Sequence, residues 1–81
     1  MKIAEFKLLS AARSIRQVVF MRTQESAWHV YAFAVDEDNE LDVYGNQLMG
    51  TRGEPRTYTS LDRAYEAIRA AGYAGIIVID R

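Results

Sequence analysis

The chain has 81 residues, enough for one hydrophobic core, so we expect a single domain over residues 1–81. A hydrophobic fraction of 49% argues against intrinsic disorder. The net charge of −1 gives no basic excess, so we expect weak nucleic-acid binding or none. The lack of cysteine excludes disulfides, a thiolate nucleophile and sulfur-ligated zinc.

Targeting and membrane signals are missing from the sequence. Lys2, Glu5 and Lys7 interrupt what would be the apolar part of a signal peptide. No run approaches the roughly 18 apolar residues of a membrane span. We therefore predict a cytoplasmic protein that does not associate with membranes.

The first twelve residues fit two structures. Ala4, Phe6 and Leu8 alternate with charged residues, as in a strand, whereas Ile3, Phe6 and Leu9 share one face of a helix. The Ala, Lys and Leu content favours the helix. We predict a helix and keep the strand as the alternative.

Two strands are predicted at residues 17–21 and 28–35, joined by a polar connection into a hairpin. The acidic segment 36–42 then favours a turn, and residues 41–44 return as a third strand of an antiparallel meander. The acidic spacing resembles a calcium loop only superficially, because Leu41 stands where the sharp turn needs Gly and Gln47 where a bidentate Glu belongs. We expect no metal site.

Three glycines and the only proline lie in residues 45–55, which predicts a long exposed loop before a short strand at 56–58. Glycines and arginines over residues 50–56 suggest a phosphate cradle. The strand and helix that flank glycines in known phosphate-binding motifs are missing here, so ordinary solvated arginines are the simpler interpretation.

The spacing of apolar residues predicts a helix over residues 60–71, with a buried stripe of Leu61, Ala64, Tyr65, Ile68 and Ala71. Arg63, Glu66 and Arg69 are expected on its wet face. Thr59 with Asp62, or alternatively Ser60, would cap its start, and Gly72 would end it.

The unbroken β-branched run at residues 75–80 predicts a strand inside the sheet, covered on both faces. Because strand 56–59, helix and strand 75–80 follow in order, the two strands are expected to be parallel neighbours. The predicted fold is a small α+β two-layer sandwich: an antiparallel meander with the helix packed on one face.

Enzymatic chemistry has little support. The only histidine, His29, lies in the middle of a predicted strand, where a structural role is expected, and a triad needs a base with an orienting acid. We predict no enzymatic activity, no catalytic residues and no cofactor.

Two surfaces are candidates for binding. Leu48 and Met49, framed by Arg52 and Arg56, form the predicted protein-binding surface on the loop. The alternative is that Leu48 and Met49 fold back over the sheet as a lid. A second surface, for nucleic acid, would join these two arginines to Arg13, Arg16 and Arg22, with Trp28 or Tyr31 as a stacking face.

The C-terminal part shows a resemblance. Residues 56–64, Arg-Thr-Tyr-Thr-Ser-Leu-Asp-Arg-Ala, followed by residues 68–73 and a hydrophobic strand, resemble a pattern in small plasmid-borne accessory proteins, including partition-associated ones. Residues 18–22 are similar to the aliphatic-arginine strand upstream in those proteins. The resemblance implies an accessory role on a mobile element and assigns no catalytic residues.

These observations together predict a non-catalytic binding or regulatory accessory protein. We expect it to act through contact with a protein partner, and a homodimer is one form of that contact. The alternative is a nucleic-acid-binding accessory protein that uses the arginines.

Overall fold

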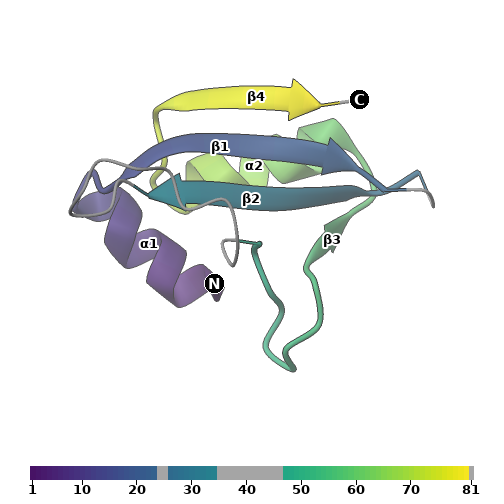
Figure 1. Cartoon of the computed structure of the whole chain (residues 1–81), viewed down its shortest axis with the longest axis horizontal. Helices are drawn as coiled ribbons and strands as arrows, with labels where there is room; N and C mark the ends of the chain where they lie inside the picture. The colour runs from purple at the N-terminus through teal and green to yellow at the C-terminus, as the bar shows by residue number, and fades with distance from the viewer. Residues whose placement is uncertain (24–25, 35–46, 81) are drawn as a thin grey trace.

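The computed structural model describes residues 1–23, 26–34 and 47–80. Its elements form a four-stranded mixed sheet, in the order β3-β2-β1-β4, and two helices (Figure 1). In chain order they are α1 (Ile3–Ala11), β1 (Ile15–Arg22), β2 (Trp28–Ala34), β3 (Thr57–Tyr58), α2 (Leu61–Ala70) and β4 (Ile76–Asp80). The predicted α+β class is confirmed.

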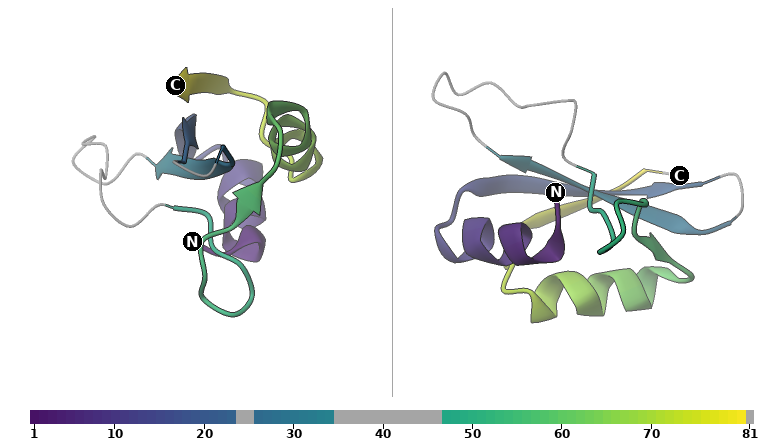
Figure 2. Two further views of the ribbon diagram at one scale, coloured as in Figure 1. Left: turned by 90° about the vertical axis from the view of Figure 1, so that its right-hand side faces the viewer. Right: turned by 90° about the horizontal axis from the view of Figure 1, so that it is seen from below.

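Both helices cover the same face of the sheet (Figure 2). Along β1, Val18 and Phe20 point toward the helices and are fully or almost fully buried. Their antiparallel partners on β2, Ala32 and Val30, are buried as well. Alternation along each strand therefore gives one core face, which packs against Phe6 of α1 and Ile68 of α2.

The predicted hairpin is confirmed, since β1 and β2 pair antiparallel from Ile15 opposite Ala34 to Arg22 opposite Trp28. The register shifts between Ile15 and Gln17, which is typical of a β-bulge. The short strand predicted at 56–58 is confirmed as β3, which pairs with β2. The acidic turn 36–42 and the third strand at 41–44 lie outside the described residues.

The first residues form a helix, which confirms the favoured alternative. α1 buries Phe6 completely, while Ile3 and Leu9 are partly buried against the core. The helix ends with two backbone hydrogen bonds, from Arg13 N–H to the Ser10 carbonyl and from Ser14 N–H to the Leu9 carbonyl. This ending needs a residue with positive φ, and Arg13 fills the position at +57°.

The helix predicted at 60–71 is confirmed as α2. Of the caps considered, Ser60 is the one observed, because its hydroxyl accepts a hydrogen bond from Arg63 N–H at 3.2 Å. Gly72, at φ +97°, ends the helix as predicted. One residue of the predicted buried stripe is wrong: Tyr65 is 49% exposed, because it lines an open groove beside β4 and does not enter the core.

The predicted exposed loop is wrong at its start. Leu48 is fully buried, and its N–H donates to the Val30 carbonyl at 2.7 Å. Met49 N–H donates to the Met1 carbonyl at 2.7 Å, so the segment is fixed between β2 and the N-terminus. The lid alternative is therefore the correct one for Leu48, and the turn exposes only the residues that follow.

The strand predicted at 75–80 is present as β4, but its predicted position is wrong. β4 lies at an edge of the sheet and pairs in parallel with β1, while β3 lies at the opposite edge. The crossover through α2 therefore spans the whole sheet and does not join neighbours. Sequence order allowed both solutions, and the pairing of β4 with β1 decides between them.

The burial of Leu48 gives a stability prediction. We expect Leu48→Ala to lower the free energy of unfolding by about 2–5 kcal/mol, through lost burial and the cavity left behind. Arg52→Ala, an exposed position in the same segment, is expected to cost no more than about 0.5 kcal/mol. Urea titrations of both variants measure the difference, and equal losses would contradict the placement of Leu48 in the core.

Candidate protein-interaction edge

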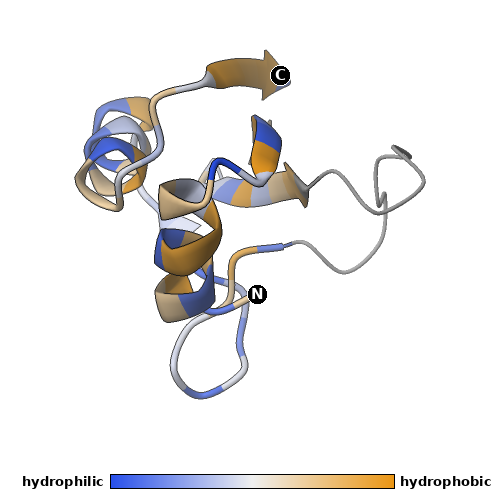
Figure 3. Ribbon diagram, turned by 90° about the vertical axis from the view of Figure 1, so that its left-hand side faces the viewer, coloured by the Kyte–Doolittle hydropathy of each residue, from blue (hydrophilic) through white to orange (hydrophobic). Residues whose placement is uncertain are grey.

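The outer edge of β4 carries most of the exposed apolar surface. Among the described residues, six large hydrophobic side chains are exposed, and all but Leu8 lie on β4 or beside it. Ile76, Val78 and Ile79 belong to β4 itself and are 68%, 38% and 46% exposed. Figure 3 shows β4 as a continuous hydrophobic ribbon at the sheet edge. Apolar side chains gathered in this way mark an interaction surface more often than singly scattered ones do.

Two further residues extend this surface to the elements next to β4. Met21 of β1 is the register partner of Asp80 and is 38% exposed. Tyr65 of α2 lines the same groove as Ile79. We call the set Met21, Tyr65, Ile76, Val78 and Ile79 the β4 edge surface. It wraps around the edge, with Tyr65 and Ile79 on the helix side of the sheet and the other three on the opposite side.

The groove between α2 and β4 has a volume of about 430 Å³. Its apolar lining includes Leu61, Tyr65, Ile77 and Ile79, and its charged residues are Asp62 and Arg69. It can accept an apolar side chain and offers a carboxylate and a guanidinium for polar groups beside it. A mostly apolar lining with few charged residues is typical of a surface that contacts a protein segment.

Arg69 ties the end of α2 to the start of β4. Its guanidinium donates to the carbonyls of Tyr73, at 2.9 Å, and Gly75, at 3.3 Å. The same guanidinium lies over the Tyr65 ring, 4.9 Å from the ring centroid. Arg69 was predicted on the wet helix face, yet it is partly buried and fixes both the strand and the tyrosine.

Tyr73 holds β4 from the core side. Its side chain is 4% exposed, its ring packs against Phe6 with centroids 6.2 Å apart, and its hydroxyl donates to the Ile76 carbonyl at 2.6 Å. A Cβ at Gly75 would lie 2.6 Å from that hydroxyl, so only glycine lets the chain pass the ring here. The path of β4 is thus set by Arg69, Tyr73 and Gly75 together.

The edge of β4 lacks the features that usually prevent strand pairing between molecules. The strand contains no proline and no lysine, its register with β1 is unbroken, and Asp80 at its end is its only charge. Natural sheet edges are commonly protected by such charges, prolines or bulges. An apolar edge without them is a template for another strand.

The predicted loop surface is not assembled. Leu48 belongs to the core, Met49 and Arg56 are partly buried, and only Arg52 is exposed. The glycine N–H groups are engaged inside the turn, Gly50 with the Glu54 carbonyl and Gly53 with the Gly50 carbonyl. These two groups are therefore not available to cradle a phosphate.

The predicted arginine patch is not assembled either. Arg16 and Arg22 stand near opposite ends of β1, about 20 Å apart at the rise of an extended strand. Arg13 follows α1, and Arg52 lies at the tip of a separate turn.

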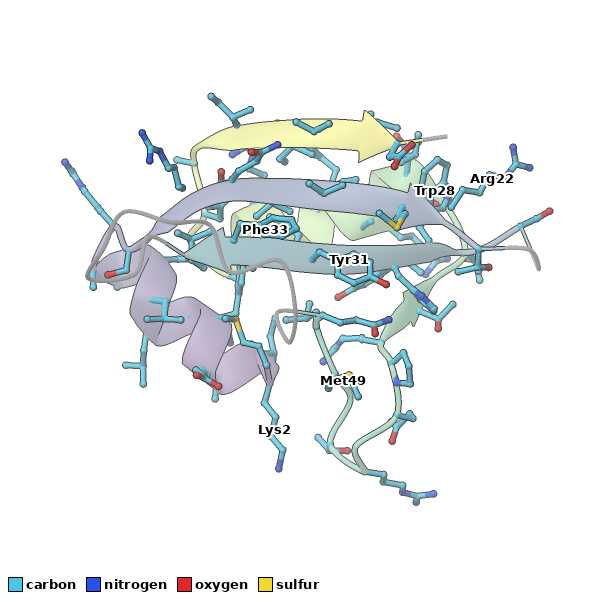
Figure 4. All side chains as sticks on the ribbon, viewed as in Figure 1. Lys2, Arg22, Trp28, Tyr31, Phe33 and Met49 are labelled. Carbon is cyan, nitrogen blue, oxygen red and sulfur yellow. The ribbon has the colours of Figure 1, made fainter. Side chains whose placement is uncertain are left out.

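The two proposed stacking residues lie on opposite faces of the sheet. Trp28 is 8% exposed and belongs to the core face at the end of the hairpin, beside Arg22, whereas Tyr31 lies on the other face near Phe33 (Figure 4). Of the two alternatives for a stacking face, Trp28 is buried in the core, and Tyr31 is partly buried on the opposite face.

No cluster of metal-ligating side chains occurs among the described residues. No group of three or more His, Cys, Asp or Glu side chains gathers there as a metal site would require. His29 is a partly buried residue near the start of β2, where it pairs with Met21 of β1 and Thr57 of β3. In residues 1–23, 26–34 and 47–80, no helix has both the length and the apolar content of a membrane span.

Comparison with known proteins finds no family model, no curated protein and no solved structure that matches this chain. The interpretation of the β4 edge surface therefore depends on its own geometry.

Sequence reasoning missed the β4 edge surface, although it identified the strand. The signal was present in the run from Ile76 to Ile79, which fits either a central strand or an unprotected edge. Tyr65 was assigned to the buried stripe by helical spacing alone. Only the sheet order shows that β4, and Tyr65 beside it, lie at an edge of the described sheet.

Tyr73 gives a prediction for alkaline pH. Burial raises the pKa of its hydroxyl above the ordinary value of 10.0, although nearby Arg69 acts in the opposite direction. The folded chain therefore keeps the phenol proton more firmly than the unfolded chain does. The stability that this provides is complete below the unfolded pKa and is lost as pH rises through the folded pKa.

We expect the free energy of unfolding to fall above about pH 10, and Tyr73→Phe to reduce that fall. At neutral pH the same substitution is expected to cost about 0.5–1.5 kcal/mol, because it removes the hydrogen bond to Ile76. Urea titrations between neutral and alkaline pH measure both effects, with exposed Tyr65→Phe as the control. An unchanged alkaline slope in Tyr73→Phe would refute the assignment.

The separation of the arginines gives a prediction for nucleic acid. We expect dissociation constants no tighter than about 10 μM at physiological salt, because few phosphates can be neutralised by one face. Fluorescence anisotropy with single- and double-stranded oligonucleotides measures this. Submicromolar binding that weakens in Arg16→Ala and Arg22→Ala would show that the arginines act together despite their separation.

Proposed function

We propose that this protein is a non-catalytic binding or regulatory module that acts through protein–protein contact, with the β4 edge surface as its contact site. One observation carries the proposal: five of the six exposed large hydrophobic side chains in the described part of the chain lie on or beside one unprotected strand. Contact between apolar side chains and water is unfavourable, and burial in an interface removes that contact.

The geometry of the edge supports a strand as the element that binds. An edge strand offers unpaired backbone N–H and C=O groups, which give affinity, and side chains on both faces, which give specificity. Arg69, Tyr73 and Gly75 fix the start of β4, so little conformational entropy is lost when a partner pairs with it.

The cellular setting is a further part of the proposal. The resemblance of residues 56–64 and 68–73 to plasmid-borne accessory proteins supports a role on a bacterial mobile element, in the cytoplasm. Genes for partition, replication or defence next to this gene would support that setting, and a chromosomal metabolic neighbourhood would argue against it.

Site-specific photo-crosslinking tests the contact site. With a benzophenone amino acid in place of Tyr65, in cells that express the protein at its native level, we expect a discrete covalent adduct to a protein. Leu8 is the control position, because it is 73% exposed and lies on α1 outside the β4 edge surface. Chance collisions would label position 8 at least as strongly as position 65.

A discrete adduct from position 65 and none from position 8 is the expected result. Equal labelling at both positions, or no adduct from position 65, would show that the β4 edge surface is not a protein contact site.

A further inference from the structure

We infer that the partner of the β4 edge surface is a second copy of this chain, whose β4 pairs antiparallel with the first to join two four-stranded sheets into one. This inference rests on the proposed function, since it assumes that the edge binds protein. The element that would pair is the outermost strand on this side of the described sheet, with no described strand beyond it. A contact between identical strands closes after two copies, because each copy uses the same patch.

The five residues of β4 fix the register of the joint. Full overlap of Ile76–Asp80 with itself, in antiparallel sense, places the two-fold axis at Val78. Ile77 then lies opposite Ile79 of the second copy, and Ile76 opposite Asp80 of the second copy. A shift by one residue would turn the apolar faces of the two copies to opposite sides, so it is disfavoured.

The two-fold axis of this joint is perpendicular to the sheet, so the helices of both copies lie on the same side. Ile77 and Ile79 are on that side, because their register partners on β1 are the core residues Val18 and Phe20. The joint therefore extends the row of core side chains from one copy into the other. It also brings the two grooves between α2 and β4 together, with Tyr65 and Ile79 near the boundary.

Charge complementarity favours this arrangement. Arg69 stands at the start of β4, held to the Gly75 carbonyl, and Asp62 lines the other end of the same groove. The helix rise puts about 10 Å between these two residues, comparable to the length of β4 from Gly75 to Ile79. Antiparallel pairing turns the second copy end for end, so Asp62 of each copy faces toward Arg69 of the other.

Parallel pairing of the two strands would give a different arrangement. A parallel contact between the same two edges needs a two-fold axis along the strands, which puts the helices and grooves of the two copies on opposite faces of the joined sheet. Only the antiparallel contact keeps the core faces of both copies on one side, so the row of core side chains favours it over a parallel contact.

Sedimentation equilibrium from micromolar to millimolar protein tests the dimer. We expect a concentration-dependent mass that approaches twice the 9.2 kDa monomer. Ile79→Glu introduces a charge into the apolar row at the joint and is expected to weaken dimerisation by about tenfold or more. Because Ile79 is 46% exposed in the single chain, the variant should still fold, which urea titration checks.

A charge-specific pair of variants tests the register. In Ile76→Lys the introduced ammonium would lie opposite Asp80 of the second copy, whereas in Ile76→Glu two carboxylates would meet there. Symmetry places each substitution in the joint twice, so we expect the Lys variant to dimerise about tenfold more tightly than the Glu variant. Leu8→Lys and Leu8→Glu measure the effect of net charge alone and are expected to differ little.

Three results would overturn the inference. A mass that stays at the monomer value through the millimolar range would exclude the dimer. Folded Ile79→Glu that dimerises like the unsubstituted chain would exclude β4 from the joint. Equal dimerisation of the two Ile76 variants would exclude the register centred on Val78. If a monomeric chain still gives crosslinks from position 65 to a different protein, the proposed function survives and only the second copy is excluded.

Discussion

The pairing of β1 on both of its sides is the interaction on which the rest of the structure depends. β1 is hydrogen-bonded to β2 in antiparallel sense and to β4 in parallel sense, and its alternate residues Val18 and Phe20 lie under the helices. A two-stranded hairpin alone is only marginally stable in water. The addition of β4, with helices on one face, converts the hairpin into a sheet with a core.

The parallel pairing of β4 has a structural consequence. A parallel strand must be reached by a crossover, and here that crossover is α2, which starts at β3 on one edge and delivers the chain to the other edge. The core is thereby closed beneath the sheet, but among the described strands the last one pairs only with β1. Its β-branched side chains are suited to burial, and its position leaves a large part of them exposed.

This conflict between composition and position is the basis for interpreting β4 as a contact site. A solvent-facing edge strand in a monomer is normally short, polar or interrupted. β4 is apolar and uninterrupted, and Arg69, Tyr73 and Gly75 hold its start in a fixed path. Specific interactions thus hold this strand in a fixed position at the edge. A partner strand would pair with its backbone groups and bury its side chains.

The sequence by itself determined the local structure. Ser60 and Gly72 mark the ends of α2, because a hydroxyl cap and a left-handed residue act within one helix turn. The β-branched and aromatic runs identified β1, β2 and β4 as strands for the same reason, since those preferences depend on each residue and its near neighbours. The α+β class follows from these elements.

Only the tertiary structure decided which surfaces are buried and which are exposed. Leu48 enters the core through backbone pairing with Val30, eighteen residues earlier, and no local pattern specifies such a partner. Ile76 and Val78 are exposed because β4 lies at an edge of the described sheet and these two side chains point away from the face that the helices cover, although the same sequence suits a central strand. Local preferences act through adjacent residues, whereas sheet order is set by the free energy of burying the whole core, and that order placed the candidate contact site.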